Sequence, residues 1–278
     1  MKRVIQFCSV LVLVQLHWAA IAAETNAPSL FADKRLEAAV RKFVFDKRDN
    51  DKPLTESDLA NLSTIQAVGL GITNLAGLEK CLNLASLELG RNQISDLSPL
   101  KGLTKLQYLN ISHNQISDIA PLADVPGLQY IELSNNRVSN LRPLASLTNL
   151  MSLYLSTNQI NDISPIIALP RLATLYLDDN KVTSISGING LRSLTSLSLN
   201  ENAVADLAPL DGLKNLYFLS LEQNKIRDLA PLVEMARKDT EQRFAPFIQV
   251  YLKGNPLSSA SKRQHIKALK EIGSRISN

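Results

Sequence analysis

A hydrophobic period of 22 residues runs along most of the chain and constrains its fold more than any other feature. Each unit has the form L-x-x-L-x-L-x-x-N-x-I, as in Leu106, Leu109, Ile111, Asn114 and Ile116. A unit this short cannot bury its hydrophobic face alone, so neighbouring units stack and share one continuous core. The sequence therefore predicts an elongated array of repeats.

The positions within each unit predict its local structure. The L-x-L piece is typical of a short strand, because side chains alternate across a strand and both aliphatic residues then point into the core. We expect the recurring asparagine to satisfy backbone groups of its own turn and the next turn. A proline three residues after an aspartate, as in Asp96 and Pro99, predicts a tight turn or 3₁₀ segment on the convex side. Gly187 replaces this proline in one repeat, where we expect a local weak point.

The ends of the chain differ from the array. Residues 1–23 have a basic start, an apolar run and small residues near Ala22, which predicts a cleaved signal peptide and a secreted or periplasmic protein. Residues 24–58 are predicted to form an N-terminal helical cap, in which Thr55 begins a helix. The array spans residues 59–257 as nine repeats. An insertion at residues 235–243 is expected to extend a helix on the convex side.

Residues 258–278 are predicted to form a C-terminal helical cap. Ser259 or Ser261 offers a cap for its helix, and Gly273 follows the helix end. No apolar run in the mature chain is long enough to cross a membrane, so no membrane span is expected. The basic tail lacks interleaved aromatic residues, which argues against nucleic-acid binding.

These repeats carry the leucine-rich repeat signature, and their D-I/L-x-P-L ending closely resembles that of bacterial internalins. The resemblance covers residues 59–257. It implies an α/β fold, namely a right-handed solenoid with a parallel sheet on its concave face and helical caps, which binds other proteins through that face. Internalins usually carry an immunoglobulin-like module and a wall-anchoring motif after the repeats. Neither follows here, which favours a small secreted or periplasmic protein over a host-cell adhesin.

Tyrosines mark the predicted binding face. Five of the six tyrosines occupy outward strand positions, and the sixth, Tyr217, is beside them. Tyrosine favours strands for structural reasons, but it occurs nowhere else in this chain and is enriched at binding hot spots. Flanking carboxylates can attract a basic partner or simply aid solubility. The candidate ligand-binding residues are Glu88, Tyr108, Tyr130, Glu132, Tyr154, Tyr176, Phe218 and Tyr251.

The sequence lacks the motifs of catalysis and of cofactor binding. It contains no P-loop, dinucleotide-binding glycine motif, zinc-protease motif or serine-hydrolase motif. His113 and His265 have no second ligand at metal-binding spacing, and Cys81 occupies a leucine position, where it is interpreted as apolar filler. We therefore expect no enzyme activity, no metal and no cofactor.

The sequence favours a monomeric, non-catalytic module that binds another protein or an extended peptide. A first alternative is a carbohydrate or cell-wall binder, because aromatic stripes also stack on sugars. A second is a regulatory subunit of a phosphatase, since similar 22-residue repeats occur in such proteins. The predicted signal peptide argues against the second alternative.

Overall fold

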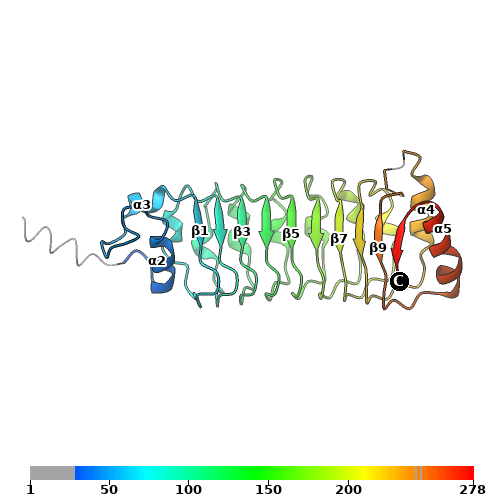
Figure 1. Ribbon diagram of the computed structural model, residues 1–278, viewed down its shortest axis with the longest axis horizontal. Coiled ribbons are helices and arrows are strands. Elements are labelled where there is room, and N and C mark those ends of the chain that lie inside the picture. Colours follow the sequence, from blue (N-terminus) through cyan, green and yellow to red (C-terminus); the bar gives the residue numbers. More distant parts are fainter. Residues whose placement is uncertain (1–28, 242, 245) are drawn as a thin grey trace, which may run out of the picture.

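One parallel sheet organises the molecule (Figure 1). The computed structural model describes residues 29–278 apart from 242 and 245, so the predicted signal peptide lies outside the described residues. Ten strands follow one another in chain order, which confirms the predicted solenoid. The strands are β1 (Thr64–Gln66), β2 (Ser86–Glu88), β3 (Tyr108–Asn110), β4 (Tyr130–Glu132), β5 (Ser152–Tyr154), β6 (Thr174–Tyr176), β7 (Ser196–Ser198), β8 (Phe218–Ser220), β9 (Gln249–Tyr251) and β10 (Arg275–Ser277).

The register places equivalent residues of successive repeats side by side. Tyr108 pairs with Tyr130, and Leu109 pairs with Ile131. The middle residue of each repeat strand is buried, while most of the flanking residues are only half-buried. The core is continuous from Phe31 to Leu269. Columns of side chains therefore run across the strands, and the outward columns form the concave face.

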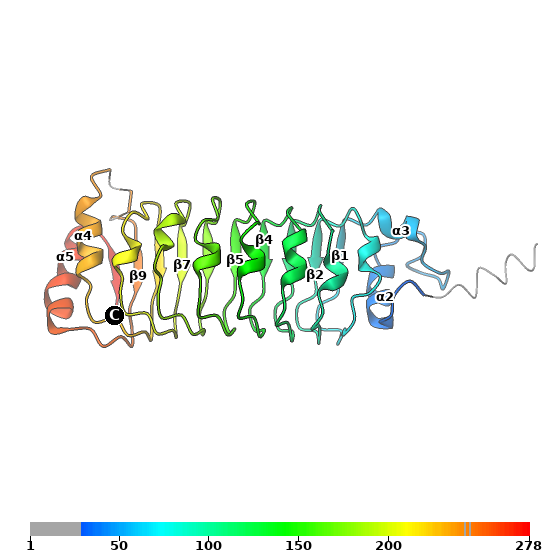
Figure 2. The same ribbon diagram turned by 180° about the vertical axis from the view of Figure 1, so that it is seen from behind.

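The convex side carries short 3₁₀ helices, which Figure 2 shows from behind the sheet. Asp96 Oδ1 accepts a hydrogen bond from Ser98 N at 2.8 Å, and Pro99 lies in the first turn of η2. This confirms the predicted turn, which the aspartate side chain caps. The 3₁₀ helices of the repeats are η1 (Leu78–Lys80), η2 (Ser98–Leu100), η3 (Ala120–Asp124), η4 (Arg142–Leu144), η5 (Ser164–Ile166), η6 (Ile188–Gly190) and η7 (Ala208–Leu210).

Gly187 does more than replace a proline. Its φ of +79° lies in the left-handed region, which proline cannot adopt, and η6 begins one residue after it. A Cβ added to Gly187 would lie 2.6 Å from Ile167 Cδ1. This repeat therefore uses a different turn, and glycine suits both its conformation and its packing.

The repeated asparagines form a ladder, but its direction differs from the prediction. Asn158 Nδ2 donates to Leu155 O in its own turn and to Leu133 O in the preceding repeat, both at 3.0 Å. Its Oδ1 accepts from Val138 N at 2.9 Å. Each amide thus connects its turn to the repeat before it. The expectation of contacts to the next repeat was wrong.

Two short helices cover the N-terminal end of the sheet. Helix α2 (Lys34–Arg41) buries Leu36 and Val40. In front of α3 (Glu56–Ala60), the backbone N–H of Thr55 donates to Asp58 Oδ2 at 2.7 Å, as a capping box requires. Lys47 Nζ lies 2.6 Å from the same carboxylate. The first strand therefore has a packed neighbour and not a bare hydrophobic end.

The C-terminal end carries helices and one strand. Helix α4 (Ala230–Lys238) begins where earlier repeats have a 3₁₀ turn and continues into the predicted insertion. The last helix joins a π-helical turn, η8 (Ser261–His265), to α5 (Ile266–Glu271). Ser258 Oγ, and not Ser259 or Ser261, accepts from a helix N–H, that of Ser261, at 3.1 Å.

The chain turns back after Gly273, whose φ of +102° ends the helix as predicted. Residues 275–277 then pair with β9 as β10. The prediction of a purely helical cap missed this strand. Within the part of the chain that the structure describes, we find no helix long and apolar enough to span a membrane.

Candidate functional site

Six aromatic rings make one continuous row across the concave face, which we call the aromatic ladder. It runs from β3 to β9, and each ring contacts the next. The two rings of Tyr108 and Tyr130 stack with centroids 4.5 Å apart and planes 11° apart. The later centroid separations are 5.3 Å for Tyr130–Tyr154, 5.2 Å for Tyr154–Tyr176, 6.1 Å for Tyr176–Phe218 and 5.5 Å for Phe218–Tyr251.

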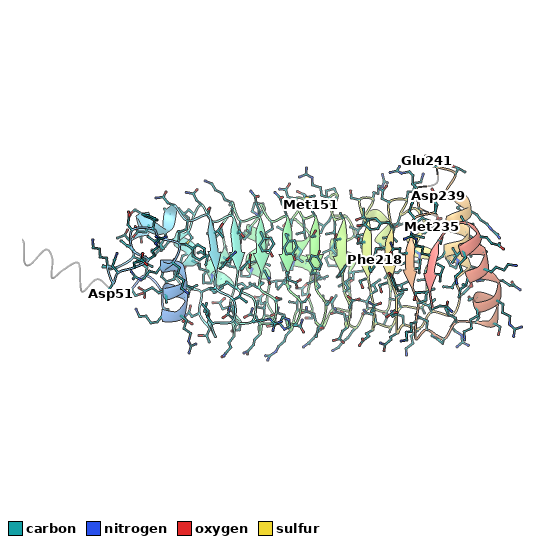
Figure 3. The ribbon with its side chains drawn as sticks, viewed as in Figure 1. Asp51, Met151, Phe218, Met235, Asp239 and Glu241 are labelled. Atoms are coloured by element: carbon teal, nitrogen blue, oxygen red, sulfur yellow. The ribbon has the colours of Figure 1, made fainter. Side chains whose placement is uncertain are left out.

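The ladder remains continuous where one strand contributes no ring. Tyr176 belongs to β6 and Phe218 to β8, yet their rings stack at 24°. The strand between them carries Ser196 and Ser198, which are small and buried. Because these serines leave room, rings on both sides approach each other over β7. Figure 3 shows Phe218 among the side chains on this face of the sheet.

The ladder phenols are half-buried and lie near one another and near carboxylates. Burial raises the pKa of Tyr130, and the neighbouring Tyr108 and Glu132 add to this shift. Burial also raises the pKa of Tyr154, with a further contribution from Glu132. The pKa of Tyr176 is raised for the same reason, and next by Tyr154 and Asp178. These hydroxyls stay protonated at neutral pH, so they can donate and accept hydrogen bonds.

Four carboxylates lie along the concave columns on alternate repeats. Glu88 and Glu132 end β2 and β4, whereas Asp178 and Glu222 come two residues after β6 and β8. Glu132 Oε1 accepts from Ser134 N at 2.7 Å, and Asp178 Oδ1 accepts from Asn200 N at 2.8 Å. No ion pair among the described residues includes any of the four. Their negative charges therefore remain available to a partner.

The structure brings the predicted aromatic residues together, whereas two further acidic residues lie apart from them. Asp179 and Glu201 lie on left-handed turns, with φ of 51° and 54°, and not on the strand columns. The binding role of the candidate residues stays a prediction. Met151 and Phe247, which are 47% and 63% exposed, were not predicted to belong to this face, and Tyr217, which is 50% exposed, was predicted only to lie beside the tyrosine columns. Met151 and Tyr217 occupy the position just before a strand, which their 22-residue spacing already indicates.

A second ladder was also missed. Asn149 Nδ2 donates to Pro126 O at 3.1 Å, and its Oδ1 accepts from Arg171 Nη1 at 3.1 Å. Asn215 makes the equivalent contacts with Arg192 O and Arg243. The recurrence of asparagine at this second repeat position was its sequence signal. These contacts connect successive repeats and are structural.

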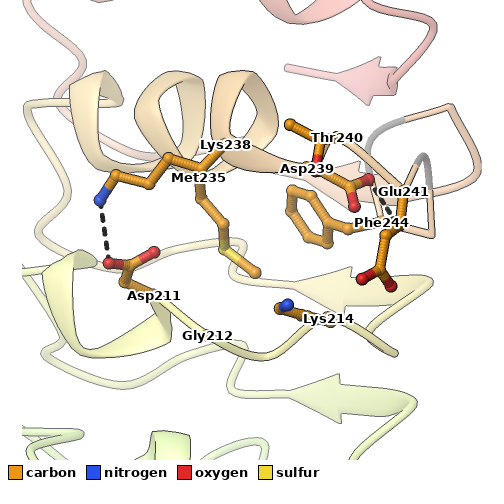
Figure 4. Close-up of a pocket in the computed structure, with 9 residues that line it drawn as sticks. All are labelled: Asp211, Gly212, Lys214, Met235, Lys238, Asp239, Thr240, Glu241 and Phe244. Atoms are coloured by element: carbon orange, nitrogen blue, oxygen red, sulfur yellow. Dashed lines mark hydrogen bonds and ion pairs between the residues drawn. The ribbon is translucent and has the colours of Figure 1, made fainter.

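A cavity of about 260 Å³ lies at the C-terminal end (Figure 4). Met235 of α4 and Phe244 form its apolar wall. Lys238 Nζ lies 3.1 Å from Asp211 Oδ2, and Phe244 N donates to Asp239 Oδ2 at 2.7 Å. Because these contacts hold α4 and the following loop on the array, we assign the cavity a structural role.

The described side chains give little support for catalysis or for metal binding. Over residues 29–278, apart from 242 and 245, no group of three His, Cys, Asp or Glu side chains is placed to hold a metal. Burial raises the pKa of the Cys81 thiol to about 12, so this thiol is a poor nucleophile at neutral pH.

The solenoid and its ladders define a leucine-rich repeat protein. The family model for leucine-rich repeats (two copies) matches residues 82–124 and, in overlapping copies, residues 126–234. The chain therefore belongs to this family. Among solved structures, it is 33% identical to internalin C2 of Listeria monocytogenes, with a TM-score of 0.73 over 82% of this chain and all of that one. The chain is thus an internalin-like leucine-rich repeat protein.

Two further solved structures share the fold. Internalin InlF of Listeria monocytogenes is 25% identical, with a TM-score of 0.53 over 91% of this chain and 94% of that chain. A leucine-rich repeat protein of Leptospira interrogans is 23% identical, with a TM-score of 0.64 over 74% of this chain and 57% of that chain, and supports the fold alone. No curated protein matches the sequence.

Proposed function

We propose that the chain is a non-catalytic binding module for another protein or an extended peptide, which it holds on the concave face. The observation that carries this proposal is the aromatic ladder. Its half-exposed rings cross seven consecutive repeat strands. Tyrosine supplies a large amphipathic contact area at low entropic cost and is enriched at hot spots. A continuous aromatic surface of this size on a monomer is typical of an interaction site.

The size of the face agrees with a protein partner. Nine strands at about 4.8 Å span about 40 Å, and about five residues of width give roughly 16 Å. The resulting area of about 640 Å² is of the same order as the roughly 800 Å² that one partner contributes to a standard interface.

The ring geometry favours a protein over a glycan. A sugar that stacks on an aromatic residue covers the open face of its ring. In the ladder, Tyr108 and Tyr130 cover each other's faces at 4.5 Å, and Tyr176 and Phe218 do so at 6.1 Å. Each of these four rings therefore has one face closed to a sugar, while the tyrosine hydroxyls can bond to backbone and side-chain groups of a protein.

The proposal includes a secreted or periplasmic location. The internalin-like family assignment and the predicted signal peptide at residues 1–23 support it. A phosphatase subunit in the cytosol would require the same segment to remain uncleaved. Determination of the N-terminal residue of the mature protein distinguishes the two, because cleavage after Ala23 is expected for export.

Capture experiments test the binding surface. Mature chain (residues 24–278) serves as bait for envelope and secreted proteins, beside a variant with Tyr130→Ala, Tyr154→Ala and Tyr176→Ala. We expect a partner that binds the wild type and is lost from the variant. Phe45→Ala is the matched control, since this ring is 75% exposed and lies outside the ladder.

Three readouts decide the result. Circular dichroism of the triple variant must match that of the wild type for a loss to be attributed to the surface. Soluble glycans are added as competitors, and displacement by a glycan would favour the carbohydrate alternative. Equal binding by the wild type and the triple variant would show that the ladder is structural.

A further inference from the structure

The charge of the concave face restricts the partner that the proposed function requires. From β1 to β8, four positions of each repeat face this surface, namely the first and last strand residues, the residue before the strand and the second residue after it. None of these positions holds Lys or Arg, whereas Lys253 and Arg275 hold the equivalent positions on β9 and β10, and Lys253 lines a pocket with Glu222. Over the eight repeats together, carboxylates occur at four of these positions, namely Glu88, Glu132, Asp178 and Glu222. A surface with one sign of charge favours a partner of the opposite sign.

The carboxylates follow a regular spacing across the sheet. Glu88 and Glu132 lie on β2 and β4, and Asp178 and Glu222 follow β6 and β8, so each is two strands from the next. Two strand spacings correspond to about 9.6 Å. The last two carboxylates lie two residues further along their strands than the first two. This lateral shift is within the reach of long Lys and Arg side chains.

Among common peptide conformations, polyproline II comes closest to this spacing with the same side facing the sheet. Polyproline II has three residues per turn and a rise of about 3.1 Å, which gives about 9.3 Å per turn. An extended β-strand alternates its faces, so its third residue points away. An α-helix returns to the same face after about 10.5 Å in seven residues, which is further from the carboxylate spacing than the polyproline II repeat.

The aromatic ladder suits the same conformation. Grooves lined with aromatic residues bind polyproline II segments through proline rings that pack on them. Glu132 lies beside the phenols of Tyr130 and Tyr154, and Asp178 lies beside that of Tyr176. A cation placed there interacts with an aromatic ring and a carboxylate together.

We propose, on the basis of the proposed function, that the ladder binds a cationic peptide segment in the polyproline II conformation. A Lys or Arg at every third residue of this segment faces the row of carboxylates, and the residues between them pack on the rings. Four basic residues at this spacing match Glu88 to Glu222, so the segment is about 10–12 residues long.

Fluorescence anisotropy with labelled peptides tests this inference. The probe contains four Lys-Pro-Pro triplets. Comparison peptides place the same four lysines consecutively, replace lysine by glutamate, or place lysine at every seventh residue of a helix. We expect the triplet probe to bind mature wild-type chain at least about tenfold more tightly than the consecutive arrangement, and to weaken as salt is added. The glutamate peptide should not bind.

Matched variants locate the contact. Glu132→Gln with Glu222→Gln should weaken binding of the triplet probe at least about tenfold. Asp124→Asn with Glu234→Gln removes the same charge from exposed positions off the concave face and should leave binding unchanged. Equal binding of the consecutive or helical peptide, or no binding of the triplet probe at millimolar concentration, would overturn the inference.

The two proposals fail in different ways. If the triplet probe does not bind but a captured partner is lost from the tyrosine variant, the surface binds proteins and only the inferred partner chemistry is wrong. If neither the probe nor any captured partner depends on the ladder, both proposals are wrong.

Discussion

At the scale of single residues, one amide side chain completes several backbone hydrogen bonds. Asn158 is buried and contacts Leu133 O, Leu155 O and Val138 N. Truncation leaves Val138 N without this acceptor, at about 1–3 kcal/mol, whereas Leu133 O and Leu155 O keep the bonds that Asn136 and Asn180 donate. We predict that Asn158→Ala lowers the free energy of unfolding by about 1–3 kcal/mol in urea titrations. Asn189→Ala, at an exposed turn, is the control, and a similar loss in both variants would contradict this account.

The residue before each ladder asparagine adopts an unusual backbone conformation. Seven such residues have φ between 51° and 60°, and Thr157 is the β-branched one among them. A β-branched residue is strained in this region, whereas asparagine tolerates it. We predict that Thr157→Asn raises the free energy of unfolding by about 0.5–1 kcal/mol. Asn135→Thr, the reverse exchange one repeat earlier, should lower it, and thermal unfolding of both variants checks the pair.

At the scale of elements, the period predicted the repeat strands and turns because each has a local cause. The L-x-L alternation determines which residues of a strand are buried, and an aspartate followed by proline initiates the 3₁₀ turn. The tenth strand has no such signal, since Arg275 and Ser277 flank a single aliphatic residue. It forms because β9 offers an unpaired edge, which is a property of the folded array.

The turn at Gly187, before η6, leads to a prediction that differs from what the repeat consensus suggests. Six repeats have proline at the position of Gly187, and a consensus argument would restore it. The φ of +79° excludes proline, so we predict that Gly187→Pro lowers the free energy of unfolding by more than about 1 kcal/mol. Pro165→Ala, at the same position one repeat earlier, should cost less. A melting temperature of Gly187→Pro at or above that of the wild type would show that this turn rearranges readily.

At the scale of the whole molecule, the candidate surface was partly predictable. The 22-residue register assigns each tyrosine to an outward column, so the sequence indicated which rings share a face. It did not indicate that the rings join into one ladder. That depends on Ser196 and Ser198, whose small size lets Tyr176 and Phe218 meet over β7. Side-chain conformations of this kind depend on neighbours two repeats away and have no local signal.

The shared environment of the ladder predicts its behaviour at alkaline pH. Burial, and then the neighbouring phenols and carboxylates, raise the pKa of Tyr130, Tyr154 and Tyr176 above the ordinary value of 10.0. A folded-state pKa above the unfolded value contributes stability that is fully present below pH 10 and is lost as pH rises through the raised values. We therefore expect tyrosinate absorbance of the native protein to rise at higher pH than that of the urea-unfolded chain.

The same three phenols should account for both the late tyrosinate absorbance and the loss of stability at alkaline pH. In a variant with Tyr130→Phe, Tyr154→Phe and Tyr176→Phe, the late-titrating absorbance should disappear, because the phenols whose pKa burial raises have been removed. The loss of stability above pH 10, followed by urea unfolding at each pH, should shrink in that variant. Coincident titration curves for native and unfolded wild type would mean that the phenols are fully hydrated and that the ladder is open in solution. The ring contacts and the binding surface inferred from them would then need revision together.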